Sequence, residues 1–287
     1  MAAWFDNFFF TYQSLIYSVG VNGLLALSIY VVLAVGQLSL GQAAFMGLGA
    51  YSSALLAKAG APIAVGLLGS VAVPALAAIV VGGPTLRLSG IYLALATIGL
   101  GEVLRIVFVN AGFTGGALGL SGIPMLDDYV ALFAIYGALA AALLALTLVA
   151  RSAIGRAMEA MREDEVAAGS LGVNLPRARL TALVVSAALA GLAGAFNAHV
   201  TSFIGPNDYG FDTAVTILSF ALLGGIGSPF GPVLGAAILT LLPEVLRPLH
   251  DLRLAVNGLI IVIAVLFMPR GLLVWRMPRI GSGASRT

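Results

Sequence analysis

The sequence predicts an all-α membrane protein, a polytopic bundle of transmembrane helices. Of its 287 residues, 60% are hydrophobic and only 9% are charged. A helix needs ~20 mostly apolar residues to cross a bilayer core, and runs of that kind recur along the whole chain. The charges instead gather at 151–179, which holds five of the 14 basic and four of the 12 acidic residues. We therefore expect one transmembrane domain, 1–287, with a single charged loop at 151–179.

Composition excludes several kinds of chemistry. The chain has no cysteine, so disulfides, thiol catalysis and cysteine-ligated metals are impossible. Its two histidines, His199 and His250, lack metal-ligand spacing, and no metal site or cofactor is expected on this chain. A net charge of +2 does not indicate nucleic-acid binding. The first 13 residues contain no Lys or Arg, which favours a retained helix over a secretory signal.

The apolar runs predict about nine spans, with eight or ten as alternatives. Gly41, Gly47 and Gly49 favour close packing or a broken helix at 42–58. The segment 213–246 reads as two short helices interrupted by glycine and proline, which can form a full hairpin or a re-entrant unit. The expected spans are 14–36, 42–58, 62–83, 90–110, 129–150, 180–203, 213–223, 233–246 and 254–268.

The basic residues predict the orientation, because cytoplasmic loops are enriched in Lys and Arg. With nine spans and an external N-terminus, the cytoplasmic side holds Arg87, the five arginines of the central loop and four arginines of the C-terminal tail. The external side holds Lys58, Arg247 and Arg253. We therefore expect an external N-terminus and a cytoplasmic C-terminus.

The central loop has a pattern that predicts a compact knob. Helix-favouring residues occupy 154–162, a polar run follows, and Gly172 and Pro176 are expected to end the segment. Such a knob could fit a cleft on a soluble protein, although composition alone favours a solvated connection between two spans. The residues expected to contact a partner are Arg162, Glu163, Asp164, Glu165, Ala168, Gly169 and Gly172.

Polar residues inside the spans are the candidates for a translocation pathway or for the bundle interior. Glu102 and Arg105 are three positions apart on one helix, so they share a face and can pair. The pair is either a structural pair buried against neighbouring spans or part of a pathway where Glu102 could meet an ammonium group. The other candidates are Gly41, Gln42, Thr114, Asn197 and His199; for the last two, structural hydrogen bonding is favoured.

Four stretches carry a resemblance to a known family. They are LSLGQAAFMGLGAY at 38–51, GIYLALATIGLGEVLR with TGGALGLSGIP between 90 and 124, GRAMEAMREDEVAAGSLGVN at 155–174 and LLGGIGSPFGPVLGAA at 222–237. In this order they resemble the branched-chain amino acid permeases of ABC importers, of the M-subunit type. The third stretch looks like the EAA-type coupling loop of such permeases. Neither the LSLGQ motif nor the glycines after Thr114 indicate nucleotide binding, because the chain has no GxxxxGK[ST] loop.

The resemblance implies a non-enzymatic transport subunit in a bacterial inner membrane. Its implied partners are a second, similar permease, two cytoplasmic ATPases that carry the ATP, and an external solute-binding protein. The implied substrates are branched-chain or related small amino acids, with urea, short amides or another small solute as the alternative. A secondary transporter or channel is disfavoured by the shortage of intramembrane acids. An intramembrane enzyme is disfavoured because no catalytic constellation is present.

Overall fold

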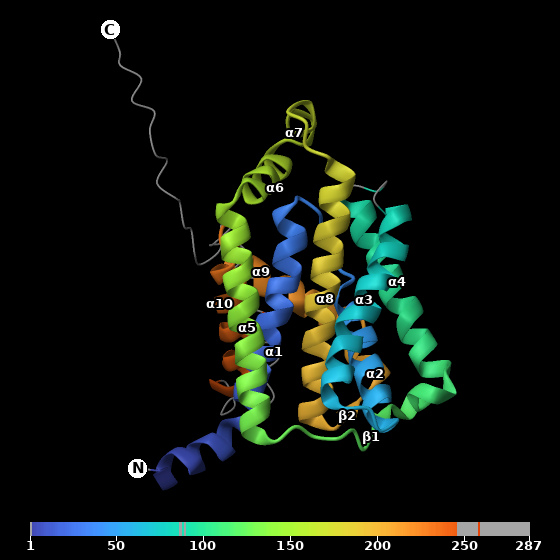
Figure 1. The fold of residues 1–287 in the computed structure, drawn as a ribbon, viewed down its shortest axis with the longest axis vertical. Helices are drawn as coiled ribbons and strands as arrows, with labels where there is room; N and C mark the ends of the chain where they lie inside the picture. Colours follow the sequence, from blue (N-terminus) through green and yellow to red (C-terminus); the bar gives the residue numbers. More distant parts are fainter. Residues whose placement is uncertain (1, 86–87, 89, 246–257, 259–287) are drawn as a thin grey trace.

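The protein is a bundle of long helices (Figure 1). The computed structural model describes residues 2–85, 88, 90–245 and 258, with side chains from Tyr12 onward. In chain order the elements are α1 (Ala2–Ala34), α2 (Gln42–Lys58), α3 (Ile63–Thr85), α4 (Ile91–Asn110), η1 (Gly112–Thr114), η2 (Gly116–Leu118), β1 (Leu120–Ser121), α5 (Asp128–Arg151), α6 (Ala153–Glu163), α7 (Glu165–Ser170), α8 (Leu175–Thr201), β2 (Phe203–Ile204), η3 (Pro206–Tyr209), α9 (Phe211–Gly224) and α10 (Phe230–Val245).

Among the described residues, five helices are long and apolar enough to cross a membrane: residues Tyr12–Ala34 of α1, and all of α3, α4, α5 and α8. The shorter α9 and α10 are also apolar. The prediction of a helical membrane protein is therefore confirmed, whereas the count of nine spans stays a prediction. The last expected span, 254–268, lies outside the described residues apart from Gly258, as do His250, Arg87, Arg247, Arg253 and the arginines of the tail.

The two ends of the bundle differ in structure (Figure 1). One end carries α6 and α7, and the other carries β1, β2 and the short 3-10 helices. We name them the α6–α7 end and the β1–β2 end. At the latter, Leu120 pairs with Ile204 and Ser121 pairs with Phe203 in a two-stranded antiparallel sheet. This sheet ties the glycine-rich loop after α4 to the chain after α8.

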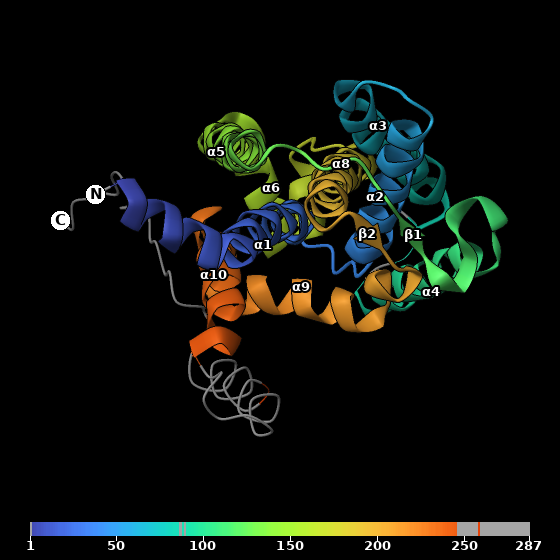
Figure 2. The same ribbon diagram turned by 90° about the horizontal axis from the view of Figure 1, so that it is seen from below.

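Helix α8 lies in the middle of the bundle beside α1, with α2 and α3 against its other side (Figure 2). The close approach of α8 to α2 and α3 depends on glycine. A Cβ on Gly191 would lie 2.5 Å from Pro74 Cγ of α3, and a Cβ on Gly194 would lie 2.9 Å from the carbonyl carbon of Met46 in α2. Small residues let helices pack at short range where lipid supplies no hydrophobic drive between them.

Of the two alternatives predicted for 42–58, close packing is confirmed and a broken helix is wrong: α2 is one uninterrupted helix, and a Cβ on Gly49 would lie within 3.0 Å of the backbone of Gly191 in α8. Helix α2 begins inside the bundle, where Gln42 is only 1% exposed. The non-helical chain before it is supported by hydroxyls: Thr97 Oγ1 accepts from Leu40 N at 2.9 Å and Ser39 Oγ accepts from Gly41 N at 3.3 Å. Irregular backbone is tolerated at membrane depth only where protein groups satisfy it.

The segment that contains α2 runs from the α6–α7 end of the bundle to the β1–β2 end. At its start, Gly36 packs against the backbone of Arg162 in α6. At its finish, Lys58 Nζ donates to the carbonyl of Ser121 in β1 at 2.9 Å. The α9–α10 pair likewise forms a hairpin, since Gly224 and Gly235 bring the two helices into backbone contact.

Two expected boundaries were wrong. Helix α8 begins at Leu175, five residues before the expected start at residue 180, because the Asn174 side chain accepts from Arg177 N and caps the helix. Pro176, expected to end the loop segment, instead sits in the first turn of α8. Proline fits there because the first turn leaves its backbone N–H groups unbonded.

Candidate functional site

The α6–α7 knob, residues 152–174, is assembled from short helices with side-chain caps. Ser152 Oγ accepts from Ile154 N at the start of α6. Asp164 Oδ1 accepts from Val166 N and Ala167 N at the start of α7. Gly172 then turns the chain with a φ of +88°, a conformation that glycine adopts without strain. The predicted helix and its glycine turn are thus confirmed, and the knob is an ordered structure.

The inner side of the knob packs against the bundle. Met161 and Ala168 are both only 1% exposed and share a cluster with Tyr30 and Val31 of α1 and with Val35, which directly follows α1. Ala168 therefore keeps the knob compact and does not present its methyl group to a partner. The knob is consequently packed against the end of α1 through buried apolar side chains.

The outer side of the knob exposes large apolar side chains among charges. Val166 is 83% exposed, Leu171 is 80% exposed and Ile154 is 64% exposed. Contiguous apolar patches on a polar surface mark protein interaction sites, whereas single exposed apolar residues are ordinary. The contacts predicted from the sequence are charged and small residues, and these three exposed apolar residues are not among them.

Most polar side chains of the run at 162–165 make contacts within this chain. Arg162 Nη1 donates to the carbonyl of Ile226 at 3.2 Å, Asp164 caps α7, and Glu165 forms an ion pair with Arg179 of α8. Glu163 is exposed, as are Gly169 and Gly172. Contacts of these residues with a partner stay predictions, and the structure gives three of the four polar ones an internal role.

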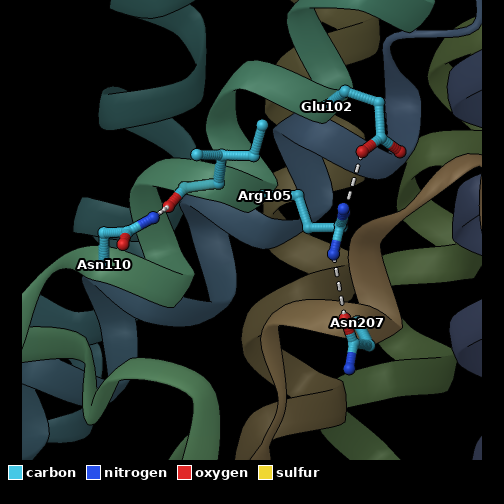
Figure 3. Close-up of polar contacts among 5 residues, drawn as sticks. Glu102, Arg105, Asn110 and Asn207 are labelled. Atoms are coloured by element: carbon cyan, nitrogen blue, oxygen red, sulfur yellow. Dashed lines mark hydrogen bonds and ion pairs between the residues drawn. The ribbon is translucent and has the colours of Figure 1, made fainter.

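Glu102 and Arg105 form the predicted pair on α4 (Figure 3). Arg105 Nε lies 2.8 Å from Glu102 Oε2, and Arg105 Nη1 donates to Asn207 Oδ1 of η3 at 3.1 Å. The expected burial against neighbouring spans is not found within this chain, where the Glu102 side chain is 37% exposed and that of Arg105 is 32% exposed. The tie to Asn207, 102 residues away, could not be read from the sequence.

Glu102 also borders a small cavity between α2, α4 and α9. The cavity has a volume of about 10 Å³, and Leu40, Gly101 and Tyr209 contribute to its walls. This volume is enough for about one water molecule. The described conformation therefore brings a charged pair and a small void together, with no room there for an amino acid.

His199 is fully buried and held by two hydrogen bonds. Its Nδ1 lies 2.8 Å from the Pro124 carbonyl and its Nε2 lies 2.9 Å from Ser53 Oγ. A carbonyl only accepts, so Nδ1 carries the proton and, in the neutral ring, Nε2 accepts from the serine. His199 thus joins α8 to α2 and to the loop before α5, which is the structural role that the sequence analysis favoured.

The other candidate residues are also placed in the interior. Gln42 Nε2 donates to Ser186 Oγ of α8 at 3.3 Å. Gly41 is buried at the start of α2. Thr114 is fully buried, and its hydroxyl donates to the carbonyls of Phe108 and Ala111. Asn197 is half-buried near the β1–β2 end of α8. Over the described ranges, no cluster of three or more His, Asp or Glu side chains could hold a metal ion.

Comparisons with known proteins agree with this architecture. The family described as "Branched-chain amino acid transport system / permease component" matches residues 11–267. The chain is 33% identical over 301 residues to the high-affinity branched-chain amino acid transport system permease protein LivM of Salmonella typhimurium (strain LT2), covering 93% of this chain and 69% of that protein. It is 35% identical over 136 residues to LivH of Escherichia coli (strain K12), covering 46% of this chain and 44% of LivH.

Two further proteins are more distantly similar. The autoinducer 2 import system permease protein LsrC of Enterobacter sp. (strain 638) is 30% identical over 239 residues, covering 78% of this chain and 67% of LsrC. The solved structure of PsaBC from Streptococcus pneumoniae in complex with Fab matches with a TM-score of 0.49 and 18% identity over 93% of this chain and 94% of that one. The likeness to PsaBC is too weak to support any inference about this chain.

The long apolar helices define a helical membrane protein. The family match over most of the chain is more specific. The chain belongs to the branched-chain amino acid ABC transporter permease family.

Proposed function

We propose that this chain is one membrane subunit of an ATP-driven importer for branched-chain amino acids in a bacterial inner membrane. A second permease completes the membrane part, two cytoplasmic ATPases hydrolyse ATP, and an external binding protein delivers the substrate. This chain binds no nucleotide itself. The α6–α7 knob is the surface on which an ATPase docks.

The observation that carries the docking assignment is the two-sided character of the knob. Its inner side packs against α1 through buried apolar side chains, whereas its outer side exposes Val166 and Leu171. The combination supports docking, because the packed inner side fixes the position of the exposed apolar side chains on the outer side. A partner that binds the knob differently in two conformations can bias the membrane helices toward one of them.

The proposed orientation places the α6–α7 end in the cytoplasm and the β1–β2 end outside. In the described part of the chain, the five arginines of residues 151–179 belong to the α6–α7 end. Lys58 lies at the opposite end, bonded to Ser121. This asymmetry follows the enrichment of basic residues in cytoplasmic loops, and it supports an external N-terminus.

The substrate is proposed from the relatives, since LivM and LivH are described as branched-chain amino acid permeases. The similarity to LsrC makes autoinducer 2 the second candidate, and urea or a short amide remains a third. The test is uptake of radiolabelled leucine into proteoliposomes that hold the full importer and its binding protein. We expect uptake that requires hydrolysable ATP and that excess isoleucine or valine competes away.

Two results would contradict the proposal in different ways. Uptake that is equal with a non-hydrolysable ATP analogue would favour a secondary transporter or channel. ATP-driven uptake of autoinducer 2 or urea without uptake of leucine would keep the class of transporter and change its substrate. Liposomes with the permeases alone provide the matched control for leakage.

A further inference from the structure

Arg162 connects the knob to a segment that is far away in the sequence. It belongs to the last turn of α6, and its Nη1 donates to the backbone carbonyl of Ile226 at 3.2 Å. Ile226 lies in the connection between α9 and α10. A hydrogen bond from a guanidinium is charge-assisted and therefore stronger than one between neutral groups. Since its acceptor is a main-chain atom, the bond holds the backbone of the connection.

The end of α6 is also fixed to α1. Gly36 follows α1 with a φ of +75°, and a Cβ on it would lie 3.3 Å from Arg162 Cα. Met161, the preceding residue, is buried against α1. Among the described residues, a cavity of about 1090 Å³ bordered by α1, α5 and α6 lies beside this contact. The described residues thus leave a cavity next to α6, although the last turn of α6 packs against the end of α1.

The two helices of the α9–α10 hairpin pack closely near their connection. A Cβ on Gly224 would fall within 3.0 Å of Gly231 and Pro232, and a Cβ on Gly235 would fall within 3.0 Å of Gly224. The two helices therefore touch backbone to backbone near the connection, where packed elements transmit displacement as rigid bodies. Figure 2 shows the hairpin at the side of the bundle, with α9 running from α4 toward α10.

The other end of α9 is held by a second arginine. Arg105 of α4 donates to Asn207, and Asn207 lies in η3 directly before α9. The hairpin is therefore held by two arginines. Arg162 of the knob contacts the α9–α10 connection, and Arg105 of α4 contacts η3 before α9, which we call the root of the hairpin. The root contact lies in η3, which directly follows β2 in the chain.

We infer that Arg162 is a positioning residue that couples the α6–α7 knob to the α9–α10 hairpin. Movement of the knob, driven by the ATPases, pulls the hairpin through the Ile226 carbonyl and alters its root beside Glu102 and Arg105. Arg162 is then a transmission contact and not a docking contact for the ATPase. This inference rests on the proposed function, because it states how that function is transmitted through the chain.

The test uses the complete importer in nanodiscs with the variant Arg162→Ala. Arg177→Ala, at the start of α8 at the same end of the bundle, is the control that also removes one positive charge. Spin labels on Ser228→Cys, in the α9–α10 connection, and Leu148→Cys, on α5, report the position of the hairpin; the chain has no cysteine of its own. We expect Arg162→Ala to bind the ATPases as the wild type does and to hydrolyse ATP.

Three readouts should then distinguish a role of Arg162 in transmitting movement from a purely structural role. In Arg162→Ala, transport per ATP hydrolysed should fall at least about tenfold, which corresponds to the loss of one charge-assisted hydrogen bond. The label distance should no longer change between the nucleotide-free and ATP-trapped states, and Arg162→Lys should restore part of both. If Arg162→Ala does not assemble, Arg162→Gln provides the same comparison, because it keeps an aliphatic stem and loses the charge.

Two outcomes would overturn the inference. One is an assembled Arg162→Ala importer with the distance change and transport of the wild type. The other is loss of ATPase binding in Arg162→Ala, which would make the residue a docking contact. Failure of the proposed function gives a different result, since the wild-type importer itself would then show no ATP hydrolysis stimulated by the loaded binding protein.

Discussion

Replacing Gly191 with alanine should destabilise the protein through a single methyl group. A Cβ at this position would lie 2.5 Å from Pro74 Cγ, 3.2 Å from Pro74 Cβ and within 3.0 Å of the Ser70 carbonyl oxygen. Non-bonded carbon atoms rest about 3.5–4.0 Å apart, so α3 and α8 must separate by roughly 1 Å. Neither a proline ring nor a main-chain carbonyl can rotate out of the way.

The expected cost follows from that displacement. A gap of ~0.5–1 Å forfeits a quarter to a half of each dispersion contact along the interface, and overpacked cores lose ~1–3 kcal/mol. Alanine is otherwise better than glycine in a helix by ~0.5–1 kcal/mol, so the net loss should lie between about 0 and about 2.5 kcal/mol and centre on about 1 kcal/mol. The matched control is Gly99→Ala in α4, where a Cβ would meet nothing within 4 Å and where we expect a neutral or stabilising change.

The assay is the midpoint of thermal unfolding of the purified protein in detergent, followed by fluorescence-detected size exclusion. Gly191→Ala should lower the midpoint by several degrees, and Gly99→Ala should leave it unchanged or raise it. Equal midpoints for the two variants would refute the reasoning, because the two substitutions then could not differ in packing.

Two further predictions concern orientation and the charged pair. Single cysteines at Asp127 and Asp164 should respond differently to an impermeant thiol reagent in intact cells, with labelling only at 127; external labelling at 164 would overturn the orientation. Glu102→Ala should lower the amount of assembled protein, because Arg105 keeps only Asn207 as a partner in a setting where an isolated charge costs ~2.5–3.5 kcal/mol. Adding Arg105→Leu should restore the amount and most of the leucine uptake. A double variant that assembles well and fails to transport would instead place the pair on the pathway.

The positions of the helices were predicted well from the sequence, because the apolar runs and the residues that end them lie close together in the chain. The apolar runs of α3, α4 and α5 were found with boundaries close to those observed, since Pro62 and the glycines next to them interrupt the pattern. The start of α8 was placed too late, although Asn174 before a proline in the first turn is a recognisable capping signal. Asp164 before α7 is a second such signal, and it was assigned to docking instead of capping.

Long-range contacts were beyond the sequence because they depend on how the helices pack. The tie from Arg162 to Ile226 spans 64 residues, and nothing near either residue indicates the other. The partial exposure of the Glu102–Arg105 pair depends on which side of α4 is covered by α9 and η3, and a helical pattern alone does not decide this. The apolar surface of the knob was missed for the same reason, since burial separates Ala168 from Leu171.

The central claim is that the α6–α7 knob docks the ATPase, and its most direct test is the affinity of purified ATPase for permeases in nanodiscs. The variant is Leu171→Asp, which places a charge on the outer side of the knob where Leu171 is 80% exposed. The control is Leu118→Asp at the β1–β2 end, where Leu118 is 87% exposed. Truncation or charge at a docking anchor typically costs at least ~2 kcal/mol, or more than about tenfold in affinity. The account predicts that loss for Leu171→Asp and wild-type affinity for Leu118→Asp; wild-type affinity in Leu171→Asp, or an equal loss in both variants, would contradict it.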